Sequence, residues 1–85
     1  MADVVMYMRP MCPFCSRAES LLNAKGVSYE QFDIWQEAGR REEMIQRSKG
    51  ATTVPQIFIG GQHVGGSDDL IRLEQQGKLD QMLAG

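Results

Sequence analysis

The chain of 85 residues has no long apolar segment and no stretch dominated by one charge. Its longest apolar run, residues 4–8, is far shorter than the roughly 20 residues that a membrane-spanning helix needs. The net charge is −2 with both signs interspersed, which gives no reason to expect a membrane, a nucleic acid or another polyanion as a partner. With 42% apolar and 24% charged residues, the composition predicts a soluble monomer with one domain, residues 1–85.

Cysteine is scarce, because Cys12 and Cys15 are the only two, and His63 is the single histidine. A structural zinc site usually takes four ligands, so this set is incomplete and we expect no metal. The first residues carry neither the basic region nor the apolar core of a secretory signal, so we expect a cytoplasmic location. In a reducing compartment a lone cysteine pair is more often catalytic than a permanent cross-link. Redox chemistry is therefore the favoured interpretation, with half a zinc site or a structural disulfide as the alternatives.

The order of apolar and helical segments predicts an α/β fold, β-α-β-α-β-β-α. We expect strands at residues 4–8, 28–34, 54–59 and 62–64, and helices at residues 13–25, at residues 38–49 and from about residue 67 onward, the last one interrupted by Gly77. The first two strands should be parallel, because a helical crossover joins them, and Gly60-Gly61 should turn the last two into an antiparallel hairpin. These connections predict a four-stranded mixed sheet with helices on both faces.

The predicted helices are amphipathic, so each should bury one face against the sheet. In the first helix this face is expected to consist of Phe14, Ala18, Leu21 and Leu22. Gly26 is expected just beyond the end of that helix, where a left-handed residue commonly ends a helix. The second helix should bury Met44 and Ile45 beneath solvated arginine and glutamate side chains.

The motif Cys12-Pro13-Phe14-Cys15 lies between the first strand and the first helix. Free N–H groups and the dipole at a helix start favour negative charge, so they stabilise a thiolate, which is the form that attacks a disulfide. We expect Cys12 at the helix N-cap or the first helical position with its sulfur facing solvent, and Cys15 one turn further on and more buried. Cys12 is then the nucleophile and Cys15 the resolving thiol. Arg9 either adds positive charge near the sulfur or binds a substrate carboxylate.

Three motifs in this order and spacing resemble those of the dithiol glutaredoxins, in particular the small bacterial ones of the glutaredoxin 3 type. The motifs are Tyr7-x-Arg9-x-x-Cys12-Pro13-Phe14-Cys15, Thr53-Val54-Pro55 and Gly65-Gly66-Ser67-Asp68-Asp69. The resemblance covers essentially the full chain. It implies a thioredoxin fold, a redox-active Cys12–Cys15 disulfide and a glutathione-dependent thiol–disulfide oxidoreductase. It also implies glutathione as co-substrate, no tightly bound cofactor, and glutathionylated or disulfide-containing proteins as partners.

The resemblance further implies a glutathione site built from these motifs. The residues that it assigns are Arg9, Cys12, Phe14, Arg41, Thr53, Val54, Pro55, Gly66, Ser67 and Asp68. A cis peptide bond before Pro55 would turn the Val54 backbone toward Cys12 as an edge on which a cysteinyl peptide can pair. Arg9 would meet the glycine carboxylate of glutathione, and Asp68 its α-ammonium group. Two assignments stay open, because the Ser67-Asp68 segment is also typical of a helix N-cap and Arg41 of a solvated helix charge.

Two alternative functions remain at this point. One is a carrier in which two chains bridge a [2Fe–2S] cluster through Cys12 and glutathione, and Pro13 argues against it because cluster-binding relatives usually lack that proline. The other is a redoxin that thioredoxin reductase reduces, and Arg9 and Asp68 argue against it. The favoured prediction is reduction of protein–glutathione mixed disulfides and of protein disulfides.

Overall fold

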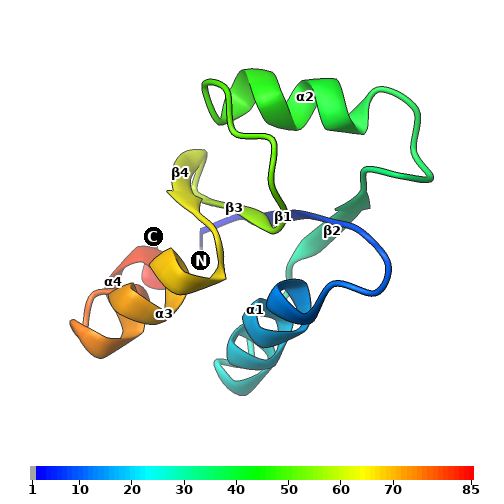
Figure 1. Ribbon diagram of the computed structural model, residues 1–85. Coiled ribbons are helices and arrows are strands. Elements are labelled where there is room, and N and C mark those ends of the chain that lie inside the picture. The colour runs from blue at the N-terminus through cyan, green and yellow to red at the C-terminus, as the bar shows by residue number, and fades with distance from the viewer. Residues whose placement is uncertain (1) are drawn as a thin grey trace.

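The computed structural model describes residues 2–85 and shows a sheet with helices on both faces (Figure 1). The elements are β1 Val4–Met8, α1 Pro13–Ala24, β2 Glu30–Asp33, α2 Arg40–Arg47, β3 Gln56–Ile59, β4 Gln62–Gly65, α3 Ser67–Gln75 and α4 Leu79–Ala84. The predicted order is confirmed, and the last helical segment is divided around Gly77 into α3 and α4. Within the described residues, no helix has both the length and the apolar character to cross a membrane.

The four strands lie in the order β2-β1-β3-β4, so β1 and β3 are interior. β1 is parallel to β2, and β3 is antiparallel to both β1 and β4, as predicted. β3 begins at Gln56 rather than at residue 54, because Pro55 has no N–H group to contribute to the ladder. The paired part of β2 is shorter than expected, although the Ile34 N–H still donates to the Met8 carbonyl at 2.9 Å. β1 and β2 therefore end at the same edge of the sheet.

The main core lies between the sheet and the three helices α1, α3 and α4, which share one side of it (Figure 1). It consists of Val4, Met6, Ala18, Leu22, Ile57, Ile59, Leu70, Leu79 and Leu83. Side chains alternate between the two faces of a strand, so Val4 and Met6 enter this core while Tyr7 enters the opposite face. Through Ala18 and Leu22 this core holds α1 against the sheet.

The opposite face is covered by α2 alone (Figure 1). Its buried cluster contains only Tyr7, Met44 and Phe58. The Tyr7 hydroxyl donates to the Glu43 carboxylate and accepts from Arg47 Nη1 at 2.9 Å. Burial, followed by the bond to Glu43, raises the pKa of Tyr7, and the bond from Tyr7 lowers the pKa of the Glu43 carboxyl. One small cluster and one polar network therefore attach α2 to the sheet.

Candidate redox site

Cys12 occupies the N-cap of α1, and Pro13 follows as the first helical residue. The Cys12 backbone is extended, with φ −116° and ψ 103°, and its sulfur accepts a hydrogen bond from the Cys15 N–H at 3.1 Å. The first turn of α1 contains no acidic residue. The predicted position is confirmed, and negative charge on the Cys12 sulfur would face a free amide and an uncompensated helix dipole.

Cys12 and Cys15 form a disulfide, with 5.2 Å between their Cα atoms. Cys15 is 2% exposed and Cys12 is 7% exposed, so Cys15 is the more buried of the two, as expected. The open exposure predicted for Cys12 is not found in this disulfide form, because its sulfur is turned toward Cys15. Of the two sulfurs, that of Cys12 belongs to the more accessible residue.

The loop before Cys12 is held by Arg9. Its Nη1 donates to the carbonyl of Pro10 at 3.0 Å and to the carbonyl of Met11 at 3.2 Å. Met11 adopts a left-handed φ of 56°, which is costly for a residue with a side chain, and it is 92% exposed. The Arg9 guanidinium carbon also lies 5.1 Å from the centre of the Trp35 ring. Arg9 therefore places its charge along the backbone that leads into Cys12.

The peptide bond between Val54 and Pro55 is cis, as the resemblance implied. Pro55 is buried, whereas Thr53 is exposed and Val54 is partly exposed. Gln56 Nε2 donates to the Thr53 carbonyl at 3.1 Å, and His63 Nε2 lies 2.6 Å from Gln56 Oε1. Thr53 and Val54 thus lie at the surface, and the hydrogen bonds of Gln56 at the start of β3 hold the segment that precedes the strand.

The start of α3 resolves which acidic residue caps it. Asp69 Oδ2 accepts from the Gly66 N–H at 2.9 Å, while Asp68 is exposed and its side chain makes no hydrogen bond to another residue within 2–85. Gly65 has a φ of 119°, and a Cβ at this position would collide with the Asp69 carboxylate, so only glycine fits the turn. Gly66 is therefore the N-cap of α3 rather than Ser67 or Asp68, and Asp69 is the acidic residue that caps the helix by binding the Gly66 N–H. This arrangement leaves the Asp68 side chain available.

Two adjoining depressions bring the predicted residues together. The first, of about 450 Å³, is lined by Phe14, Ala51, Thr53, Val54, Pro55, Gln56, His63, Gly65, Gly66, Ser67, Asp68 and Asp69. The second, of about 290 Å³, is lined by Arg9, Ile34, Trp35, Arg41, Thr52, Thr53 and Val54. They share Thr53 and Val54, and every residue assigned to the glutathione site except Cys12 lines one of them.

Phe14 corrects one sequence-based prediction. It was expected on the buried face of α1, but it is 52% exposed and lines the first depression. The buried residues of α1 are Cys15, Ala18 and Leu22. Phe14 lies one turn before Ala18 on the same side of the helix, but the buried cluster includes only Ala18 and Leu22 from α1. Position along the helix outweighs periodicity here.

Several residues that line the two depressions were not predicted as site residues, among them Trp35, Gln56 and His63. His63 is exposed and also contacts Gln56. Gln56 is only 5% exposed, so a polar residue at the start of an apolar strand was the available signal. For Trp35 the signal was its place just after β2, because parallel β1 and β2 end at one edge.

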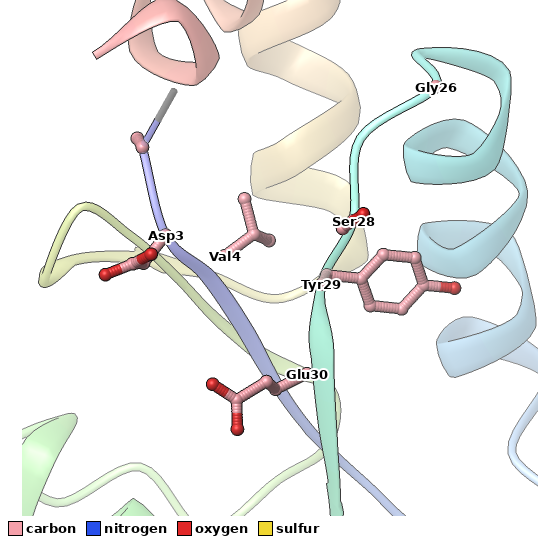
Figure 2. Close-up of a pocket in the computed structure, with 7 residues that line it drawn as sticks. Asp3, Val4, Gly26, Ser28, Tyr29 and Glu30 are labelled. Carbon is pink, nitrogen blue, oxygen red and sulfur yellow. The ribbon is translucent and has the colours of Figure 1, made fainter.

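A further depression, of about 430 Å³, lies at the other end of the β1–β2 pair (Figure 2). Its lining includes Asp3 and Val4 at the start of β1 and Ser28, Tyr29 and Glu30 around the start of β2. The cysteines follow the opposite end of β1, so this depression is separate from them. Within residues 2–85, no three or more His, Cys, Asp and Glu side chains are grouped to hold a metal ion.

Comparisons with known proteins agree with this geometry. Residues 4–64 match the glutaredoxin family. The chain is 54% identical to glutaredoxin 3 of Escherichia coli K12 over 98% of this chain and 99% of that protein. It is 46% identical to a glutaredoxin of Pseudomonas aeruginosa over 99% of both chains.

Solved structures give the same result. A buckwheat glutaredoxin–glutathione complex matches with a TM-score of 0.88 and 31% identity, over 98% of this chain and 77% of that chain. The solution structure of Brucella melitensis glutaredoxin matches with a TM-score of 0.82 and 51% identity, over 98% of this chain and 89% of that chain. These likenesses confirm the predicted thioredoxin fold.

Proposed function

Because the chain belongs to the glutaredoxin family of thiol–disulfide oxidoreductases, we propose that its activity depends on glutathione and proceeds through Cys12 and Cys15. The observation that carries this proposal is the Cys12 sulfur at the N-cap of α1, where it accepts the Cys15 N–H. A sulfur in this position is stabilised as the thiolate by the helix start. We propose that the protein acts as a cytoplasmic monomer.

On a protein–glutathione mixed disulfide, the Cys12 thiolate attacks the glutathione sulfur. The protein thiolate leaves and takes up a proton, and Cys12 becomes joined to glutathione. The thiolate of a second glutathione then attacks that sulfur, which releases glutathione disulfide and restores the Cys12 thiolate. Each step exchanges one disulfide for another, so no further oxidant or reductant takes part.

On a protein disulfide, Cys12 attacks first and Cys15 completes the reaction. The Cys15 thiolate attacks the Cys12 sulfur of the mixed disulfide and expels the second substrate thiolate. The product is the Cys12–Cys15 disulfide, which is the form present in the structure. Two glutathione molecules then reduce this disulfide in successive exchanges. The first attacks the Cys12 sulfur, which forms a Cys12–glutathione mixed disulfide and releases the Cys15 thiolate. The second attacks the glutathione sulfur, which releases glutathione disulfide and the Cys12 thiolate.

The two depressions provide the proposed glutathione site. The Val54 backbone would pair with the cysteinyl residue, and Arg9, with Arg41 beside the same depression, would bind the glycine carboxylate. At the other end, free amides of the first turn of α3 would bind the α-carboxylate and Asp68 the α-ammonium group. Two facts support this arrangement: Asp69 already provides the cap, and the similar buckwheat protein was solved as a complex with glutathione.

The test is reduction of a small mixed disulfide by glutathione, coupled to glutathione reductase and NADPH. We expect wild type and Cys15→Ser to be active and Cys12→Ser to be inactive. Wild type that fails with glutathione yet turns over with thioredoxin reductase would overturn the proposal in favour of the second alternative function. A brown [2Fe–2S] protein obtained under exclusion of air would instead support the cluster carrier.

A further inference from the structure

Trp35 is the only tryptophan of the chain, and 64% of it is exposed. A large aromatic side chain gains most when it is buried, so its exposure is not explained by packing in a core. The turn that presents it is nevertheless well defined. Asp33 Oδ1 accepts from the N–H of Trp35 at 2.9 Å and from the N–H of Gln36 at 3.2 Å. The backbone therefore holds the indole at the surface.

The parallel pairing of β1 and β2 brings this indole to Arg9. Met8 is the partner of Asp33 in the register, and the Ile34 N–H donates to the Met8 carbonyl at 2.9 Å. The chain therefore leaves both strands at one edge, with Arg9 after β1 and Trp35 after β2. The guanidinium carbon lies 5.1 Å from the ring centre, within the range in which an aromatic face attracts a cation.

The contacts of Arg9 restrain its guanidinium and still leave donors available. Nη1 is bound to the carbonyls of Pro10 and Met11, and the guanidinium also lies over the Trp35 ring. The remaining N–H groups, on Nε and Nη2, make no hydrogen bond to any residue within 2–85. Free donors on a planar, immobilised guanidinium suit a carboxylate, which is also planar.

Arg9 and Trp35 line the same depression as Arg41, Thr53 and Val54. We propose that Trp35 is a positioning residue, which holds the Arg9 guanidinium so that the site selects thiol substrates carrying a carboxylate at the glycine end of glutathione. The inference rests on the proposed function. A guanidinium that is already ordered loses less freedom when a carboxylate binds, so Trp35 contributes to selectivity without touching the reacting sulfur.

The experiment compares two substrates that differ only in this carboxylate. They are the mixed disulfide of glutathione with 2-mercaptoethanol and the same compound esterified at the glycine carboxylate. In the Cys15→Ser background, which stops at glutathionylated Cys12, the rate of modification is followed by acid quench and mass spectrometry. We expect the Cys15→Ser protein, which is the parent of the variants below, to react about tenfold faster with the acid than with the ester. A tenfold ratio corresponds to the free energy of about one charge-assisted hydrogen bond.

Replacing the indole should reduce this selectivity. We expect Trp35→Ala to lower the acid-to-ester ratio about threefold, as for an exposed cation–π contact, and Trp35→Phe to retain most of it. In an Arg9→Gln background, Trp35→Ala should have no further effect on the ratio. Lys78→Gln is the matched control for the loss of one positive charge, because Lys78 precedes α4 and lines neither depression.

Three results would overturn the inference. An unchanged ratio in Trp35→Ala would show that the indole does not act through the carboxylate. An equal loss of rate toward acid and ester would show a general structural role, and a loss that persists in Arg9→Gln would show that Arg9 is not the intermediary. A parent that reacts with neither compound would overturn the proposed function as well, which separates that failure from a failure of the inference alone.

Discussion

The two helices that begin at the site, α1 and α3, start in different ways. α1 has Cys12 at its N-cap and no acidic residue in its first turn, so its positive end is left for the sulfur. α3 has two acidic residues in its first turn, and Asp69 accepts the Gly66 N–H. The positive N-terminal end of a helix is therefore neutralised by acidic residues in α3, whereas in α1 it stabilises negative charge on a reactive sulfur. Phe14 in the first turn of α1 and Ser67 in the first turn of α3 line the same depression, so both helix starts border one candidate site.

The largest expected effect is that of Cys12→Ser, which tests the catalytic role of residue 12 separately from its role as the N-cap of α1. Cys12→Ser keeps a residue that caps helices well but removes the nucleophile. We expect activity in the glutathione-coupled assay to fall on the order of 10³-fold or more, as for loss of other nucleophiles. The free energy of unfolding in urea should equal or exceed that of Cys15→Ser, which lacks the disulfide too. Residual activity within tenfold of wild type would mean that Cys12 is not the nucleophile.

The next effect concerns the acidic residue of α3 that is not the cap. Asp68→Asn removes the charge proposed to bind the α-ammonium group, so the KM for glutathione should rise about tenfold. The kcat at saturating glutathione and the urea midpoint should stay close to wild type, because Asp68 is exposed and its side chain forms no hydrogen bond within residues 2–85. A KM equal to that of wild type would leave Asp68 outside the glutathione site.

Its neighbour should behave in the opposite way. Asp69→Ala removes the acceptor of the Gly66 N–H, and loss of such a cap costs about 1 kcal/mol of unfolding free energy. Urea denaturation measures this loss, and Asp68→Asn is the matched control in the same helical turn. Equal stability of the two variants would contradict the assignment of Asp69 as the cap.

The smallest expected effect is that of a substitution that gives the start of α1 an acidic residue, as the start of α3 has. Ser16 is exposed near the start of α1, and Ser16→Glu introduces the acidic charge that this end lacks. Like charges four residues apart on a helix repel each other by about 0.2–0.5 kcal/mol, so the added charge should raise the energy of the Cys12 thiolate. We expect the pH midpoint of Cys12 alkylation by iodoacetamide, measured in the Cys15→Ser background, to rise by a few tenths of a unit. Ser16→Gln is the neutral control, and an equal shift in both variants would rule out an electrostatic cause.

These contrasts also show what the sequence could predict. Cys12 at the start of α1 was predictable because the signals are local: a proline opens the helix, and Gly26, with φ 70°, follows its end. The choice between Asp68 and Asp69 as the cap was not, because two adjacent aspartates give the same sequence signal and side-chain orientation decides between them. The contact of Trp35 with Arg9 was hidden for another reason, since it depends on the register of two strands that are distant in the chain.

Because only a small buried cluster holds α2 against the sheet, α2 should open locally more readily than the rest of the fold. Amide hydrogens exchange with solvent through local openings, whose free energy is low where few apolar side chains are buried. The face under α2 buries three such residues, against nine on the other face, so α2 is expected to open well before the central strands do. Arg41 belongs to α2 and lines the second depression. A ligand that contacts Arg41 would bind the closed form preferentially, so its affinity and the protection of α2 against exchange are thermodynamically linked.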